Sequence, residues 1–177
     1  MDIGDLERAY DAGLFPLWAE YELMDGGLYL VPPSSPEHDG LVEKLVGYLR
    51  SLLAAAPVVV REEKPLYISE DSAPKCDLVI AQPHDYTEHK MSPADVLVVG
   101  KVCRSNRRSD FGLKPGVYAR ARIPQYWIFD VSSQTFHVYT LDNDSYVETT
   151  PTEGTIAIAG VDIAIPALIT FAFGPKA

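Results

Sequence analysis

The sequence contains little cysteine and no pattern of paired metal ligands. Its 177 residues include only Cys76 and Cys103, and neither belongs to a CxxC motif. A structural zinc site usually takes four ligands from closely spaced cysteine and histidine pairs, so a zinc-stabilised module is excluded. Disulfides are uncommon in the cytosol, where we expect this protein, and both cysteines are therefore predicted to be thiols.

Segments that would direct the chain to a membrane are also lacking. No apolar run approaches the roughly 18 residues that cross a bilayer. The acidic start, Met1-Asp2-Ile3-Gly4-Asp5, does not resemble a signal peptide. These absences favour a cytoplasmic protein. The chain likewise lacks a glycine-rich phosphate loop, a nucleophile elbow and an HExxH motif, which gives a small-molecule enzyme on an unrelated α/β fold little support.

Basic residues are in the minority, but they are concentrated. The formal net charge is -10, which by itself argues against a nucleic-acid partner. Residues 101–122 differ, because seven basic residues there face one acidic residue, a local charge of +6. The basic residues are Lys101, Arg104, Arg107, Arg108, Lys114, Arg120 and Arg122. Such a patch on an acidic body can bind a polyanion, although a solvated basic face explains the charges equally well.

The rest of the composition is typical of a globular protein with a core. Hydrophobic residues make up 47% of the chain and charged residues 23%, and the length fits a single domain over residues 1–177. Leu6, Tyr10 and Leu14 have helical spacing, which predicts a short helix over residues 4–13.

A hairpin, a long helix and several strands follow. Residues 21–24 and 28–31 flank a glycine-containing turn, which predicts a β-hairpin. Ser35 followed by Pro36 is typical of a helix N-terminus, and apolar residues then recur every three or four positions, which predicts a helix over about 36–55. Strands are predicted over residues 58–61, 66–69, 77–81 and 96–103.

The C-terminal half is predicted to add a second helix and more strands. The helix covers about 112–121, and Pro115 must lie in its first turn or bend it. Strands are predicted over 125–130 and 135–141 as a second hairpin, and more weakly over 145–149 and 155–159. Residues 166–171 form a short closing helix or turn. This order predicts one sheet backed by two main helices, with a core over about 20–170.

Two charged residues interrupt the most apolar of these strands. Asp77 begins one of them and Lys101 lies within the next. A charge at a buried strand position is costly unless it is paired or binds a metal. The ends of strands in α/β sheets are also common positions for functional sites. Any chemistry is therefore expected near Asp77 and Lys101, unless the Lys101 head group simply reaches water from the end of the strand.

Several segments resemble the Uma-type family of putative restriction endonucleases, which belongs to the PD-(D/E)XK nuclease superfamily. They match in order and spacing over about 20–170. The segments are Tyr21-Glu22-Leu23-Met24-Asp25-Gly26, Pro33-Ser34-Ser35-Pro36-Glu37-His38, Asp77-Leu78-Val79-Ile80-Ala81, Pro93-Ala94-Asp95-Val96-Leu97-Val98-Val99, Gly112-Leu113-Lys114 and, most specifically, Tyr118-Ala119-Arg120-Ala121-Arg122-Ile123-Pro124-Gln125-Tyr126-Trp127-Ile128-Phe129-Asp130. The resemblance implies an α/β fold with a restriction-endonuclease-like core, in which helices flank a mixed central β-sheet and β-hairpins are added.

The resemblance also implies metal-dependent hydrolysis of phosphodiester bonds in nucleic acid. In that chemistry two carboxylates on adjacent strands hold a divalent cation such as Mg²⁺ or Mn²⁺. The metal polarises the phosphate and activates a water, and a lysine stabilises the developing negative charge. Asp77 matches the first carboxylate, Lys114 the lysine, and His38 the histidine that opens the long helix. The implied metal position is assigned to Asp77 and Val102.

The sequence departs from the family pattern at the second carboxylate. Lys101 stands where the family has a glutamate, so a cation replaces one metal ligand. We predict that the Lys101 ammonium group pairs with Asp77, fills the metal position and impairs cleavage, so that the protein works with little or no metal. Smaller departures are Cys76 before the first carboxylate, Gly27 in the hairpin turn, and Arg104-Ser105 after the second strand.

Several alternatives stay open. Glu62 or Glu63 could replace the missing carboxylate and keep the endonuclease active. Cys76 and Cys103 could form a thiolate metal site with His38, although two small buried thiols are favoured. His38 could also be only a surface or capping residue. Lastly, the protein could bind nucleic acid or another protein without cutting.

The expected partner is DNA, contacted by the basic patch. The predicted nucleic-acid-binding residues are Arg104, Arg107, Arg108 and Arg120. Aromatic residues of the last matched segment are predicted to be core rather than base-stacking platforms; they are Tyr118, Tyr126, Trp127 and Phe129. The sequence does not decide the oligomeric state, for which a symmetric homodimer is the default expectation.

Overall fold

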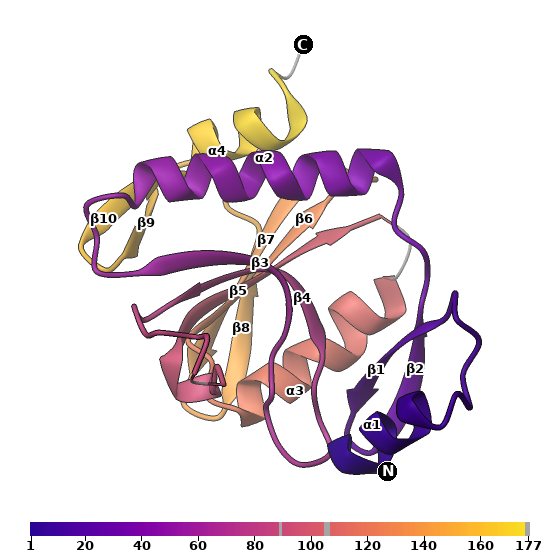
Figure 1. Ribbon diagram of the computed structural model, residues 1–177. Helices are drawn as coiled ribbons and strands as arrows, with labels where there is room; N and C mark the ends of the chain where they lie inside the picture. Colours follow the sequence, from indigo (N-terminus) through magenta and orange to yellow (C-terminus); the bar gives the residue numbers. More distant parts are fainter. Residues whose placement is uncertain (89, 105–106, 176–177) are drawn as a thin grey trace.

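The computed structural model describes residues 1–88, 90–104 and 107–175, apart from the side chains at positions 63 and 64. A six-stranded sheet in the order β3-β4-β5-β6-β7-β8 forms its centre (Figure 1). The strands are β3 Val59–Pro65, β4 Lys75–Ala81, β5 Val96–Cys103, β6 Gln125–Asp130, β7 Thr135–Asp142 and β8 Ser145–Thr149. Strands β5 and β6 pair in parallel and the other neighbours pair antiparallel, so the sheet is mixed.

Helices cover both faces of this sheet. The long helix α2, Pro36–Leu52, and the C-terminal helix α4, Ile165–Phe173, lie together on one face, and α3, Lys114–Arg120, lies on the other (Figure 1). The α2 face buries a cluster that includes Leu45, Leu49, Leu78, Ile80 and Val98. The α3 face buries a second cluster that includes Val79, Val99, Tyr118 and Tyr126. The nearly continuous apolar runs of β4 and β5 are explained by this burial on both sides, as predicted.

Two hairpins lie outside the central sheet as separate two-stranded sheets. The first pairs β1, Glu20–Met24, with β2, Gly27–Val31, and the second pairs β9, Thr155–Ile158, with β10, Val161–Ala164. Helix α1, Ile3–Asp11, lies beside the first hairpin (Figure 1). The loop between β3 and β4 holds this N-terminal unit through backbone hydrogen bonds, such as Ala73 N–H to Leu23 O at 2.8 Å.

The predicted mixed sheet, flanking helices and hairpins are confirmed, but some segments differ. Residues 66–69 were predicted to be a strand and are not: β3 is continuous to Pro65, and the chain then turns, with Leu66 N–H bonded to Pro74 O. The charged stretch before Pro65 continues the strand because β3 is an edge strand, where charged side chains are common. Strand β10 and the π-helical segment η2, Arg108–Leu113, were not predicted. Pro115 does lie in the first turn of α3.

Within residues 1–88, 90–104 and 107–175, no helix has the length and apolar character needed to span a bilayer. The longest, α2, is amphipathic, and its buried side chains are used in the core cluster described above.

Candidate active site

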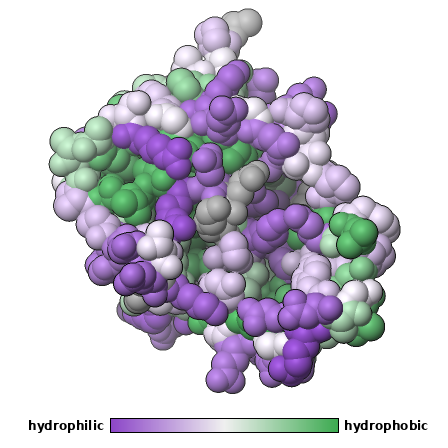
Figure 2. All heavy atoms as spheres, in the orientation of Figure 1, coloured by the Kyte–Doolittle hydropathy of each residue, from purple (hydrophilic) through white to green (hydrophobic). Residues whose placement is uncertain are grey.

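A cleft of about 790 Å³ opens between the N-terminal hairpin, the start of α2 and strands β4 and β5. The structure brings all four predicted catalytic residues to its lining: His38, Asp77, Lys101 and Lys114. Figure 2 shows hydrophilic side chains gathered across the middle of this face of the molecule, with hydrophobic ones at its right-hand edge over the N-terminal elements. The cleft is thus bounded by two units that are far apart in the sequence.

Asp77 is the centre of the hydrogen-bond network in this cleft. Its Oδ1 accepts a hydrogen bond from Lys101 Nζ at 2.6 Å, and its Oδ2 accepts one from the backbone N–H of Val102 at 2.7 Å. The Nε2 atom of His38 lies 3.2 Å from the same Oδ2. The ion pair between Lys101 and Asp77 that the sequence predicted is therefore present. Val102, the other residue assigned to the implied metal position, contacts Asp77 through its backbone amide N–H.

The backbone of β4 and β5 fixes this geometry. The two strands pair with Leu78 opposite Gly100, which places Asp77 and Lys101 at the same end of the pair. A Cβ atom on Gly100 would lie 2.6 Å from Leu78 Cγ, so a glycine is required for the strands to pack this closely. Lys101 directly follows this tightly packed glycine, and its backbone position is therefore fixed.

The electrostatics of the network favour the ionised carboxylate. Burial raises the pKa of Asp77, but the charge of Lys101 and the hydrogen bond from His38 outweigh burial and lower that pKa to about 2. The hydrogen bond to Asp77 raises the pKa of the His38 imidazole above its ordinary value, against the effect of burial. Asp77 is therefore an ionised carboxylate whose side-chain partners are the Lys101 ammonium group and the His38 imidazole.

His38 reaches Asp77 because of the way α2 begins. Ser35 is the N-cap residue, and its Oγ accepts a hydrogen bond from His38 N–H at 3.3 Å. The other ring nitrogen of His38, Nδ1, lies 3.1 Å from Asp39 Oδ1. The side chain therefore bridges two carboxylates at the edge of the cleft rather than lying free on the surface.

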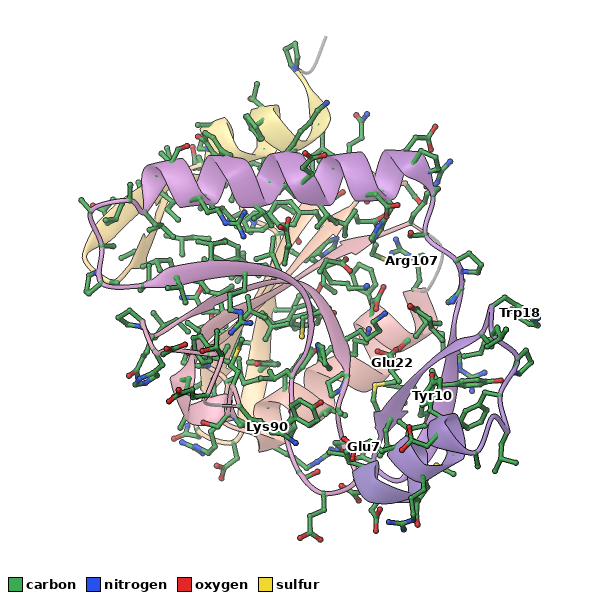
Figure 3. The ribbon with its side chains drawn as sticks, in the orientation of Figure 1. Glu7, Tyr10, Trp18, Glu22, Lys90 and Arg107 are labelled. Carbon is green, nitrogen blue, oxygen red and sulfur yellow. The ribbon has the colours of Figure 1, made fainter. Side chains whose placement is uncertain are left out.

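Lys114 is buried deeper in the cleft and is already paired. Its Nζ lies 3.1 Å from Asp110 Oδ1 and 3.2 Å from Glu22 Oε2. Burial lowers the pKa of Lys114, but the two carboxylates outweigh burial and raise that pKa above its ordinary value. Figure 3 shows Glu22 in the space between β1 and α3. Lys114 thus links the N-terminal hairpin to α3.

Glu22 and Asp110 are cleft residues that the sequence analysis did not select. Glu22 is 2% exposed and Asp110 is 1% exposed. Glu22 Oε2 also accepts a hydrogen bond from the backbone N–H of Lys75 at 3.1 Å. Glu22 belongs to one of the segments that resemble the nuclease family, and this was the available signal. Asp110 lies in η2, for which no periodic pattern was available.

The four arginines predicted to bind nucleic acid differ in their availability. Arg104 pairs with Glu37, Arg107 with the buried Asp130, and Arg120 with Asp25 through two hydrogen bonds of 2.5 and 2.7 Å. The fourth, Arg108, is exposed at the start of η2. Carboxylates thus offset much of the local positive charge. Of the four, Arg104 is the one that lines the cleft.

The two cysteines are buried thiols, as favoured from the sequence. Cys76 is 1% exposed and Cys103 is 0% exposed, and both belong to the core cluster under α3. Burial raises the pKa of Cys76 to about 11. Burial and the neighbouring Asp110 raise the pKa of Cys103 to about 12. These environments disfavour the thiolate forms that a metal site would need.

The remaining expectations have clear structural outcomes. Glu62 lies away from the cleft lining, and its Oε1 is 3.6 Å from Arg50 Nη2. The side chain of Glu63 and residue Ser105 lie outside the described part of the chain. The aromatic residues predicted to be core are 0–1% exposed; they are Tyr118, Tyr126, Trp127 and Phe129.

The described residues do not fit a divalent metal ion. Among them, no group of three histidine, cysteine, aspartate or glutamate side chains is arranged to hold a metal. Mg²⁺ takes oxygen ligands, usually including one or two carboxylates. Here Asp77 already accepts hydrogen bonds at both oxygens, one of them from an ammonium group that would repel a cation.

The mixed sheet, flanked by helices and with the Asp77–Lys101 pair on adjacent central strands, makes this an α/β protein with a polar cleft at the ends of those strands. The chain belongs to the Uma2 family, whose description is "Putative restriction endonuclease" and whose model matches residues 8–164. Among solved structures, the chain is similar to a putative nuclease belonging to DUF820 from Anabaena variabilis ATCC 29413, with a TM-score of 0.73 and 11% sequence identity. The likeness covers 98% of this chain and 99% of the other. Because the sequence identity is low, the likeness shows a shared fold and nothing beyond it. No curated protein matches this chain.

Proposed function

We propose that this protein is a nuclease-like member of its family that binds nucleic acid in the cleft and has impaired metal-dependent hydrolysis. One observation carries the proposal: Lys101 Nζ lies 2.6 Å from Asp77 Oδ1. Lys101 stands at the position where the family pattern has the second metal-binding carboxylate. A cation therefore contacts the carboxylate that would otherwise hold the metal.

The charge supplied by Lys101 explains how the fold tolerates this exchange. A glutamate and a divalent cation together contribute one positive charge to a site, and a lysine contributes the same charge without a metal. The pair is also well shielded, because the Lys101 side chain is 14% exposed and that of Asp77 is 7% exposed. The ammonium group supports the ionised Asp77, but it cannot activate a water as a bound metal would.

The impaired state is favoured over an active endonuclease with a substitute ligand. Glu62 pairs with Arg50, and the two other buried carboxylates of the cleft, Glu22 and Asp110, both pair with Lys114. Each of these carboxylates is thus committed to a cation of the protein. This supports binding without efficient cutting as the activity of the wild-type chain.

Restoring the carboxylate tests the proposal. We expect Lys101→Glu to gain Mg²⁺- or Mn²⁺-dependent nicking of supercoiled plasmid, while the wild type shows little or none. The double variant Lys101→Glu with Asp77→Ala is the matched control and should be inactive, because it again has one carboxylate. Plasmid nicking by the wild type that Asp77→Ala abolishes would overturn the proposal and favour an active enzyme.

A further inference from the structure

The cleft has an apolar rim that the proposed hydrolytic chemistry does not use. Leu17 and Trp18 both line the cleft, and they are 107% and 71% exposed. Trp18 lies at the outer edge of the N-terminal unit, in the turn that connects α1 to β1 (Figure 3). Large apolar side chains this exposed at the mouth of a polar cleft suggest a contact surface.

The local structure holds these two side chains outward. Before them, Phe15 packs against Tyr10 and Tyr21, with ring centroids 5.0 and 4.6 Å apart. After them, Ala19 is 4% exposed and its N–H donates to Pro16 O at 2.9 Å. Because both ends of the turn are anchored by packing and hydrogen bonding, the exposure of Trp18 is built into the fold.

The charges that line the same cleft are balanced, in contrast to the chain as a whole. Four carboxylates and four cations line it: Glu20, Glu22, Asp77 and Asp110, with Lys75, Lys101, Arg104 and Lys114. A glutamate at position 101 would leave the lining two charges more negative, and an anion would then need a metal to enter. With Lys101 the cleft can accept a phosphate group without one, although the chain carries a net charge of -10.

Resting on the function proposed above, we infer that the cleft takes single-stranded nucleic acid without a metal, with a base stacked on the Trp18 indole and the backbone phosphate directed to Lys101. An ammonium group has three donors, and Asp77 accepts one of those of Lys101. A base can stack on a side chain only where its face is free, as it is in a single strand and is not within a duplex.

Titration of the protein into a short fluorescein-labelled oligothymidylate in EDTA, followed by the anisotropy of the label, tests this inference and gives the affinity of each variant. A parallel titration of the wild type with the unlabelled strand follows its tryptophan fluorescence. The buried Trp127 is 0% exposed, so quenching on binding reports on Trp18. We expect the wild type to bind the single strand more tightly than a hairpin duplex, with quenching. Trp18→Ala should weaken binding at least about tenfold, whereas Trp18→Phe, which keeps an aromatic face, should weaken it less. Val147→Ala removes an exposed apolar side chain on β8 and serves as the matched control, with unchanged binding.

The other outcomes separate this inference from the proposed function. If Trp18→Ala binds oligothymidylate as tightly as the wild type does, the inference is overturned. It is also overturned if the wild type prefers the hairpin duplex and its fluorescence is not quenched. In both cases the proposed binding of nucleic acid stands. If the wild type binds neither probe, both are overturned. If sedimentation shows that Trp18→Ala dissociates a homodimer and leaves the affinity of the chain for oligothymidylate unchanged, the rim is a contact between copies and the inference again fails.

Discussion

Lys101 on β5 and Asp77 on β4 form an ion pair of 2.6 Å at the cleft, and each shields the charge of the other from the core around it. The backbone N–H of Val102 and the imidazole of His38 complete the contacts of the carboxylate. Both oxygens of this carboxylate are thus contacted by groups of the chain itself. The consequences extend to stability, acid sensitivity and metal binding.

Removing the ammonium group should destabilise the fold. Lys101→Met would leave Asp77 with two contacts instead of three, in a site where its side chain is 7% exposed. We expect a loss of about 3 kcal/mol in the free energy of unfolding, measured by urea denaturation, because breaking one partner of a buried pair leaves an uncompensated charge. Asp77→Asn in the Lys101→Met background is the control. The double variant should lose less free energy of unfolding than the two single variants lose in sum. Additive losses would show that the two residues are not coupled.

The low pKa of Asp77 predicts acid sensitivity. Its pKa falls from 3.8 to about 2 on folding, so the ionised carboxylate stabilises the folded chain above about pH 4, and this contribution is lost as the pH falls through about 2. The difference in unfolding free energy between wild type and Asp77→Asn should therefore shrink by about 2 kcal/mol between pH 4 and pH 2. A constant difference over that range would contradict this assignment.

His38 should act in the opposite direction and at higher pH. Its pKa is raised above 6.5 by the hydrogen bond to Asp77, so its stabilising contribution is complete below pH 6.5 and is lost as the pH rises through the folded value. The NMR titration of the imidazole should move to lower pH in Asp77→Asn. An unchanged titration would mean that the two side chains do not interact in solution.

Two cations of α3 should differ strongly in their effect on stability. Lys114 is buried with Glu22 and Asp110, so Lys114→Met should cost about 3–5 kcal/mol by leaving two carboxylates without their partner. Arg120 pairs with Asp25 at the surface, where both side chains are more than half exposed. Arg120→Ala should therefore cost at most about 1 kcal/mol. Similar losses for both variants, measured by urea denaturation, would contradict the buried network.

The thiols should be unreactive in the folded protein. Both are buried and have raised pKa values, so a thiol reagent such as DTNB should label neither at neutral pH and should label both after denaturation. Rapid labelling of the native chain would show that the cluster under α3 opens readily.

Much of the fold could be predicted because its signals are local. The serine and proline before α2, the glycine turn of the first hairpin and the apolar runs of β4 and β5 each favour one local structure. The Asp77–Lys101 pair was predicted from the family resemblance, which implies a second carboxylate beside Asp77 at the position where this sequence has Lys101. By contrast, the charged residues of β3 hid a strand, because an edge strand does not require an apolar pattern.

The parts of the site that were not predicted depend on contacts between distant segments. Glu22 and Asp110 meet Lys114 only through tertiary packing, and the carboxylates that neutralise Arg104 and Arg120 come from α2 and the first hairpin turn. The Trp18 rim was also missed, because nothing in the local sequence distinguishes an exposed tryptophan from a buried one. Such features need the chain folded before they can be recognised.

We claim that the Lys101 ammonium group takes the place of a metal ion at Asp77, and isothermal titration calorimetry with Mn²⁺ can decide this. The wild type should show no binding that depends on Asp77, and Lys101→Glu should gain a site that Asp77→Ala removes. Micromolar binding of Mn²⁺ to the wild type that is lost in Asp77→Ala would contradict the claim.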